Sequence, residues 1–136
     1  MIVYQIENHL SVEEYICVLI DSTLGERRPV DEPDRIAKML EHANLIVTAR
    51  HQGKLVGVAR SFTDFVYCTY LADLAIDLKY QKQGIGKELL RFVKKETPKA
   101  KLILLAAPKA VNYYPHIGMT QWKQCYTLND IHELKQ

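Results

Sequence analysis

Asp73-Leu-Ala-Ile-Asp77-Leu-Lys-Tyr-Gln81-Lys-Gln-Gly84-Ile-Gly86-Lys87 is the stretch on which the fold prediction rests. Its first part, 74–78, is apolar enough for a half-buried strand, and apolar residues recur at helical spacing after Gly86. A glycine turn between a strand and a helix lets a ligand approach the backbone closely, next to the unpaired N–H groups at the positive end of the helix. The segment therefore predicts an anion-binding loop that fits a diphosphate.

Other phosphate-binding motifs do not match this loop. A dinucleotide fingerprint needs a small residue where Leu89 stands, and a P-loop needs Ser or Thr where Glu88 follows Lys87. Three lysines add positive charge around the glycines: Lys79, Lys82 and Lys87. From the glycines alone, a plain strand-to-helix turn without a ligand remains an equal alternative.

The flanking sequence predicts an α+β fold with a mixed, mostly antiparallel sheet flanked by helices. Upstream we expect a strand over 2–6, a helix that Ser11 caps and Gly25 closes, a helix from Pro33, strands over 45–50 and 55–60, and a strand-rich segment over 66–78. Downstream we expect a helix after Gly86, a buried strand over 102–107, a short helix over 110–117 and a last strand over 121–128. A last strand exposed at the sheet edge can support a homodimer.

Length and composition favour one globular domain over residues 1–136. The 18 Lys and Arg residues against 16 Asp and Glu leave a net charge of +2, which gives no support to a nucleic-acid partner. No apolar run is long enough to span a membrane, and no signal peptide is evident, so we expect a cytoplasmic protein without a membrane partner. The three cysteines, Cys17, Cys68 and Cys125, form no metal motif and are interpreted as small buried residues.

Two blocks of this sequence resemble the GNAT family of N-acetyltransferases. Gln81-x-x-Gly84-x-Gly86 after a strand is similar to the family's acyl-CoA pyrophosphate loop. Tyr114-Pro-His-Ile-Gly118 is similar to the family's Tyr-x-x-x-Gly element, at the expected distance after the following strand. The resemblance covers the whole chain in element order, although only these two blocks are specific.

This resemblance implies direct transfer of an acetyl group from the cosubstrate acetyl-CoA to a primary amine of a small molecule or peptide. It implies that the fourth and fifth strands splay apart and that backbone groups of the fourth strand pair with the pantetheine arm. The implied cofactor-binding residues are Leu74, Ala75 and Ile76 on the strand, and Gln81, Lys82, Gln83, Gly84, Ile85, Gly86 and Lys87 in the loop. No metal is implied.

The resemblance implies a general acid more clearly than a base. Tyr114 matches the tyrosine that protonates the departing CoA thiolate in many relatives. Asp73, near the expected position of the acetyl group, is a candidate for a catalytic or amine-binding role, with a structural carboxylate as an equal alternative; water-relayed deprotonation needs no side chain. His116 is a weaker candidate.

The acceptor site is the least specified part. Arg27 and Arg28 lie between the first two helices, where relatives build part of this site, and an arginine pair can bind an acceptor carboxylate; a solvated charge run is the plainer alternative. Many relatives carry an Asn that contacts the cofactor where this chain has Ala107. A non-catalytic acyl-CoA-binding sensor or interaction module remains the alternative function.

Overall fold

The computed structural model describes all 136 residues, which form two compact units, 1–105 and 106–136. That both belong to one domain stays a prediction.

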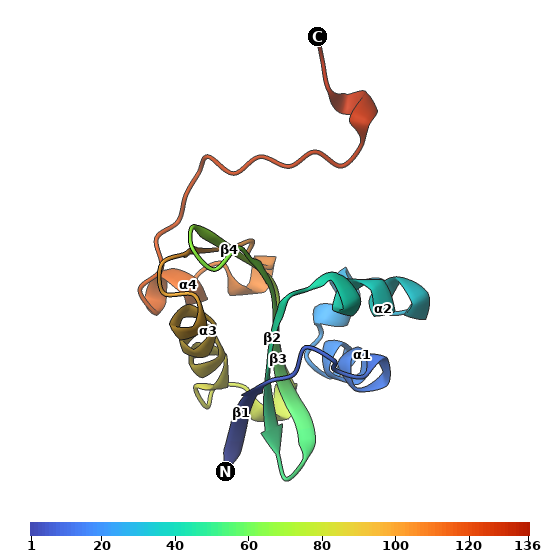
Figure 1. Ribbon diagram of the computed structural model, residues 1–136, viewed down its shortest axis with the longest axis vertical. Coiled ribbons are helices and arrows are strands. Elements are labelled where there is room, and N and C mark those ends of the chain that lie inside the picture. Colours follow the sequence, from blue (N-terminus) through green and yellow to red (C-terminus); the bar gives the residue numbers. More distant parts are fainter. The chain divides into compact units, whose positions relative to one another are not determined.

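The first unit is built on a five-stranded sheet with the order β1-β2-β3-β4-β5 (Figure 1). The strands are β1 (Ile2–Ile6), β2 (Leu45–His51), β3 (Lys54–Thr63), β4 (Cys68–Ile76) and β5 (Lys101–Leu104). The first four strands pair antiparallel, and β5 pairs parallel with β4. The predicted mixed, mostly antiparallel sheet is thereby confirmed.

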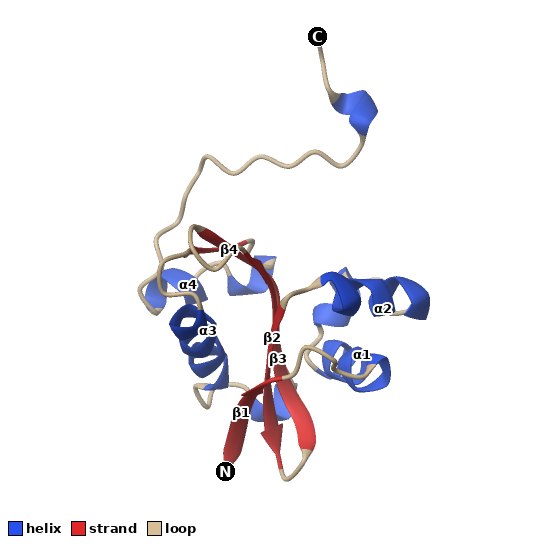
Figure 2. Ribbon diagram, viewed as in Figure 1, coloured by secondary structure: helices blue, strands red, loops and turns tan.

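Helices cover both faces of this sheet. The helices α1 (Val12–Asp21) and α2 (Pro33–His42) lie on one face, and α3 (Ile85–Glu96) lies on the other (Figure 2). As predicted, the Ser11 side chain caps α1 by accepting from the Glu14 N–H. The end of α1 differs from the prediction, since Ser22 rather than Gly25 is its C-cap. The Ser22 hydroxyl donates to the Leu19 carbonyl and accepts from the Leu24 N–H, which ends the helix earlier.

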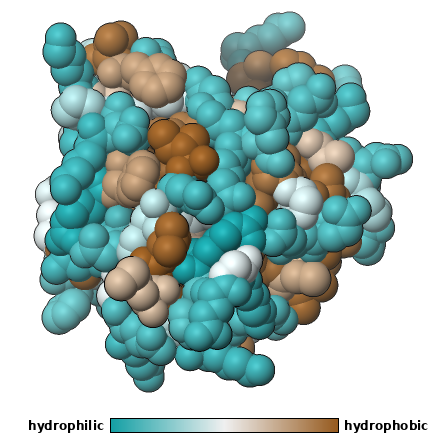
Figure 3. All heavy atoms as spheres, turned by 60° about the horizontal axis from the view of Figure 1, so that its bottom comes forward, coloured by the Kyte–Doolittle hydropathy of each residue, from teal (hydrophilic) through white to brown (hydrophobic).

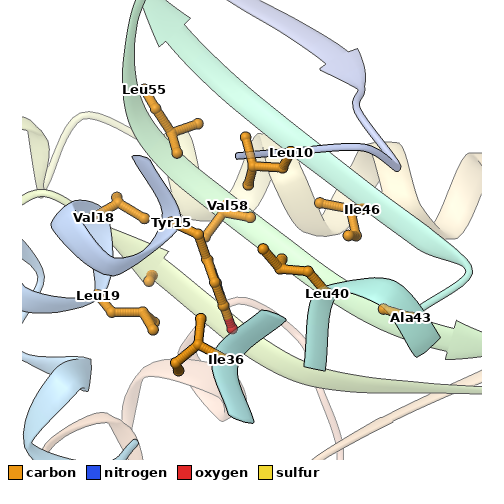
Figure 4. Close-up of a cluster of buried hydrophobic side chains, with 11 residues drawn as sticks. Leu10, Tyr15, Val18, Leu19, Ile36, Leu40, Ala43, Ile46, Leu55 and Val58 are labelled. Atoms are coloured by element: carbon orange, nitrogen blue, oxygen red, sulfur yellow. The ribbon is translucent and has the colours of Figure 1, made fainter. Parts of the chain in front are cut away.

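The larger core lies between the sheet and the pair α1 and α2. Tyr15 stands at its centre, with its ring among Val18, Leu19, Ile36 and Val58 (Figure 4). On the opposite face α3 approaches β3 closely at Gly57. A Cβ built there would lie 3.3 Å from the side chains of Ala49, Ile85 and Leu89, so glycine permits this helix-to-sheet distance. The helices on both faces of the sheet thus fix the position of β4, which lies between β3 and β5.

Strands β4 and β5 separate part-way along their length. Their pairing runs from Cys68 opposite Lys101 to Leu71 opposite Leu104, whereas β4 itself continues to Ile76. The register of β3 against β4 also shifts at this point, because Arg60 faces Asp73 but Ser61 faces Leu71. Ala72 is therefore the extra residue of a β-bulge. The expected splay of the fourth and fifth strands is confirmed in the first unit.

The second unit contains the short helix α4 (Tyr113–His116) and two 3₁₀ turns at Pro108–Ala110 and Ile131–Glu133. The predicted strand over 121–128 is wrong, because this segment has no regular structure and its side chains are exposed. An alternating pattern becomes a strand only where a neighbour completes the hydrogen-bond ladder. The homodimer expected from that strand stays a prediction.

Three further observations concern the cysteines, the hydrophobic surface and the length of the helices. All three cysteines are free and exposed, so their interpretation as buried residues was wrong. On the face shown in Figure 3, hydrophobic residues form separate small groups between hydrophilic ones. None of the helices is both long and apolar enough to cross a membrane.

Candidate functional site

The far part of β4 presents an unpaired backbone edge. The Asp77 N–H donates to the Val56 carbonyl of β3 at 2.8 Å, which fixes which residues face β3. Because successive residues of a strand direct their N–H and C=O groups to opposite sides, Ala75 faces β3 while Leu74 and Ile76 face the open side. Of the three predicted strand residues, Leu74 and Ile76 therefore carry the backbone groups that a ligand can reach at this edge.

The glycine loop follows directly after this edge. A 3₁₀ turn at Leu78–Tyr80 leads into it, and Gly84 ends it as the N-cap of α3, with a φ of +84°. No side chain caps the helix. Glu88 is the first residue of α3 whose N–H bonds to the loop, because it donates to the Gly84 carbonyl. The N–H groups of residues 85–87 are thus left for another acceptor, as an anion site requires.

Two glutamines connect the loop to its surroundings. The Gln81 amide donates to the Ile76 carbonyl at 2.9 Å, which links the loop to the open edge of β4. The Gln83 amide donates more weakly to the Lys79 carbonyl at 3.4 Å. Lys82 adopts a left-handed backbone with a φ of 63°, so two residues of this short loop have positive φ. Left-handed residues in such a loop can turn backbone N–H groups toward a bound anion.

The charge of the loop is positive and faces water. Lys79, Lys82 and Lys87 are all exposed. The nearby carboxylate of Glu88 is held by Arg91 on the next turn of α3. The lysines can therefore contribute attraction to a phosphate without an adjacent unpaired acid opposing them.

Residues of the β2–β3 hairpin contact the residues that lead into the loop. The sequence did not predict these contacts. His51 Nδ1 and the Tyr80 hydroxyl lie 2.8 Å apart in a hydrogen bond, and their rings meet edge-on. Asp77 accepts from the Lys79 N–H at 2.9 Å and lies 3.6 Å from the Lys54 ammonium. No motif spacing marks these residues, because the hairpin and the loop meet only after the sheet has formed.

Asp73 lies inside the first unit rather than at a free cleft edge. It is 1% exposed, and its carboxylate accepts from Arg60 Nε at 2.5 Å, from Arg28 Nε at 2.7 Å and from the Tyr15 hydroxyl. Burial raises the pKa of Asp73, but the hydrogen bonds and charge of Arg60, with smaller contributions from Tyr15 and Arg28, bring it below its ordinary value. A carboxylate with a lowered pKa and occupied oxygens is a weak proton acceptor.

The two arginines predicted to bind the acceptor have different environments. Arg27 is exposed. Arg28 is 24% exposed in its side chain, and its guanidinium is bonded to Asp73, to the Ala72 carbonyl at 2.8 Å and to the Arg27 carbonyl at 2.8 Å. Three of the five guanidinium N–H groups of Arg28 are thus engaged within the protein, whereas Arg27 faces water, so the two side chains do not form one matched pair.

Tyr114 and its neighbours belong to the second unit. Tyr114 is half-buried on α4, and its ring meets that of Tyr113 edge-on at 5.3 Å. Burial, and to a lesser degree the Tyr113 hydroxyl, raise the pKa of Tyr114 above 10, so the phenol stays protonated at neutral pH. Such a phenol can donate a proton to a thiolate. His116 on the same helix is exposed.

The other residue classes that carry chemistry give no site. No group of three or more His, Cys, Asp or Glu residues is arranged to hold a metal ion. Cys68 has its sulfur 4.0 Å from an Asp64 oxygen, and no histidine contacts it. The structure thus gathers Leu74, Ile76 and the loop 81–87 along the open edge of β4, and it places Asp73 with Arg28 directly before this edge on the same strand.

The sequence profile of the acetyltransferase (GNAT) domain matches residues 27–131. An uncharacterized N-acetyltransferase from Prochlorococcus marinus is 33% identical over 109 residues, which are 75% of this chain. The chain spans 59% of that relative's length.

Solved structures share the fold. A GNAT acetyltransferase from Streptococcus pneumoniae superposes with a TM-score of 0.78 over 98% of this chain and 100% of its own, at 20% identity. An aminoglycoside 6'-N-acetyltransferase complexed with coenzyme A gives a TM-score of 0.62 over 75% of this chain and 60% of its own, at 17% identity. Because the family profile covers most of the chain, the chain belongs to the GNAT acetyltransferase family.

Proposed function

We propose that this protein transfers an acetyl group from acetyl-CoA directly to a primary amine of a small molecule or peptide. The observation that carries the proposal is the uncapped N-terminus of α3 behind Gly84, placed directly after the open edge of β4. The N-terminus of α3 suits a diphosphate, and the adjacent open edge of β4 suits an extended arm that contains amides. Membership of the GNAT family supports the same reaction.

The loop would hold the pyrophosphate of acetyl-CoA. The backbone N–H groups from Lys82 to Lys87 supply donors, and the helix dipole and the exposed lysines add attraction. The role of Gln81 would be to hold the loop against the strand through its bond to the Ile76 carbonyl. The solved relative that contains coenzyme A is consistent with this choice of cosubstrate.

The open edge of β4 would hold the pantetheine arm. The arm contains two amides, and the backbone groups of Leu74 and Ile76 can pair with it as a neighbouring strand would. Ala75 lies between them with its backbone toward β3 and its side chain buried in the hydrophobic core, so it would support the strand rather than bond the arm. The carbonyl of Ile76 is shared with Gln81, which leaves its N–H as the free group.

In the proposed reaction the acceptor nitrogen attacks the thioester carbonyl carbon, the carbon–sulfur bond breaks and the amine loses one proton. Tyr114 would donate its phenolic proton to the departing thiolate, and its raised pKa keeps that proton in place at neutral pH. The amine proton passes to water, and water returns one proton to the Tyr114 phenolate, so the enzyme is regenerated. Asp73 suits a structural role better than that of the base, because its pKa is lowered and three side chains bond its carboxylate.

An acceptor screen tests the proposal. Purified protein with acetyl-CoA and a panel of amino acids, polyamines, aminoglycosides and short peptides should release free thiol with at least one amine, and the acetylated product should appear by mass spectrometry. Binding of acetyl-CoA without turnover of any amine would favour the alternative, a non-catalytic acyl-CoA-binding module. Absence of acetyl-CoA binding would contradict both.

A further inference from the structure

Arg28 is the hydrogen-bonding link between the segment that connects α1 to α2 and strand β4. Its Nε bonds the buried Asp73 carboxylate at 2.7 Å, and its Nη2 bonds the Ala72 carbonyl at 2.8 Å. Its remaining nitrogen bonds the carbonyl of Arg27 and so braces its own backbone. One side chain thus connects the segment to two consecutive residues of the strand.

The bulge in β4 explains why a side chain is needed at this place. Ala72 has no opposite residue on β3, and the pairing with β5 ends at Leu71. A backbone carbonyl that the sheet leaves out needs another donor, and Arg28 supplies it. The guanidinium fork can serve a carboxylate and a carbonyl together, which a lysine ammonium does less well.

Little else fastens the connecting segment to the sheet. The backbone bonds of residues 23–32 are local turns, such as Glu26 N–H to the Thr23 carbonyl and Glu32 N–H to the Pro29 carbonyl. Leu24 and Val30 add partly buried contacts to the core below α1 and α2. The directional bonds from this segment to β4 all come from Arg28.

The point of β4 that Arg28 bonds, at Ala72 and Asp73, lies next to the open backbone edge of that strand. Ala72 and Asp73 directly precede Leu74, the first backbone group proposed to pair with the pantetheine arm. A segment held at this point lies on the face of β4 that α1 and α2 cover, opposite the face that α3 covers. This position lets it border the acceptor at the thioester end of the arm without touching the pyrophosphate loop.

We propose that Arg28 is a positioning residue that holds the connecting segment, residues 23–32, in the conformation that binds the acceptor. The proposal rests on the proposed acetyl transfer, and it replaces the direct contact of Arg28 with the acceptor expected from the sequence. Asp73 is the fixed counter-charge of this link, since Arg60 and Tyr15 hold it even when Arg28 is removed.

The test compares Arg28→Ala, Arg28→Lys and the exposed neighbour Arg27→Ala with the full wild-type chain. Hydrogen exchange of residues 23–32 should become about tenfold faster in Arg28→Ala, to a smaller extent in Arg28→Lys, and should not change in Arg27→Ala. For the best acceptor of the screen, KM should rise about tenfold in Arg28→Ala while kcat and the acetyl-CoA Kd stay within about threefold.

The outcomes separate this proposal from the proposed function. Unchanged exchange in Arg28→Ala would overturn the link itself, and it can be measured without any substrate. Faster exchange with an unchanged acceptor KM would overturn the role in acceptor binding, as would an equal loss of acetyl-CoA affinity. Lack of turnover in the wild-type protein would instead contradict the proposed function and the acceptor role together, while the exchange data would still decide whether Arg28 fixes the segment.

Discussion

Tyr114 is the residue on which the proposed chemistry depends most. Tyr114→Phe removes the hydroxyl and keeps the ring, so the half-buried packing on α4 should survive. If the phenol protonates the leaving thiolate, kcat should fall roughly 10²–10⁴-fold with little change in acetyl-CoA affinity. Single-turnover rates are the cleanest measurement, because slow product release would hide part of the loss.

Tyr113→Phe is the matched control for that change. Tyr113 is adjacent and on the same short helix, but one residue corresponds to a rotation of about 100°, so the two hydroxyls point in different directions. Its single-turnover rate should stay close to that of the wild type. Equal losses in both variants would show that the helix is disturbed, and no loss in Tyr114→Phe would show that another group or water supplies the proton.

Asp73 illustrates what the sequence could not show at the residue scale. Its position on a strand was predictable from the local pattern, but its partners Arg60, Arg28 and Tyr15 are 13, 45 and 58 positions away. The pairing of β3 with β4 places Arg60 opposite Asp73, and the packing of α1 and of the connecting segment against β4 adds Tyr15 and Arg28. A carboxylate that looks like a candidate base in sequence is therefore an anchored ion-pair partner in the folded chain.

At the scale of elements, the glycine loop can be tested with a matched pair of glycines. Gly84 and Gly53 both have left-handed backbones, with φ of +84° and +82°, and a Cβ on either would meet no atom within 4 Å. Valine at either position should therefore cost a similar free energy of unfolding, on the order of 1–2 kcal/mol. Only Gly84→Val should lower the affinity for acetyl-CoA, by at least about tenfold, because its Cβ would stand where the pyrophosphate approaches.

Calorimetric titration with acetyl-CoA and urea unfolding of both variants check this prediction. Gly53 lies in the β2–β3 turn, so its variant reports the strain of a left-handed valine without placing a Cβ beside the N-terminus of α3. An equal affinity loss in both variants would mean that destabilisation alone weakens binding. Full affinity in a folded Gly84→Val protein would reduce the loop to a structural turn.

The starts of the helices were predictable because local signals set them. Ser11 and Pro33 mark helix starts, and Gly84 marks the start of α3, by capping and backbone preferences that act within a few residues. The support of the loop by His51 and Tyr80 was not predictable, because it joins two turns that are distant in sequence. The same holds for the bulge at Ala72, which depends on register between strands.

At the scale of the molecule, buried ion pairs should make stability depend on acid pH. The pKa values of Asp73 and Glu7 are lowered in the fold from ordinary values of 3.8 and 4.5; for Asp73 the bonds from Arg60 outweigh burial, and for Glu7 the bond from Arg50 is the largest cause. Groups with a lowered folded pKa bind fewer protons in the folded chain than in the unfolded one. Their stabilisation is therefore complete above the ordinary values and is lost as pH falls through the folded ones.

Urea unfolding between pH 7 and pH 3 measures this dependence. The free energy of unfolding should be nearly constant down to about pH 5 and should then decrease steadily. Glu7→Gln should lower stability at pH 7 and flatten the decrease, since one of the titrating groups is gone. A decrease that begins near pH 6.5 would point to histidines instead, and a flat profile to pH 3 would contradict the ion-pair account.

The C-terminal part marks the limit of prediction for the whole molecule. Trp122, Tyr126 and Leu128 alternate as in a strand, yet the segment has no regular structure. Strand formation depends on a partner elsewhere, and no local residue pattern supplies that information. The two motif blocks were accessible from sequence for the opposite reason, since each consists of contiguous residues.

The central claim is that the loop 81–87 binds the diphosphate of acetyl-CoA, and a calorimetric comparison of CoA with pantetheine tests it most directly. Two or more charge-assisted hydrogen bonds at the N-terminus of α3 should make CoA bind at least about 100-fold more tightly than pantetheine. CoA and acetyl-CoA should differ by no more than about tenfold, because the acetyl group adds only a few atoms of contact. Equal affinities for CoA and pantetheine would contradict the account.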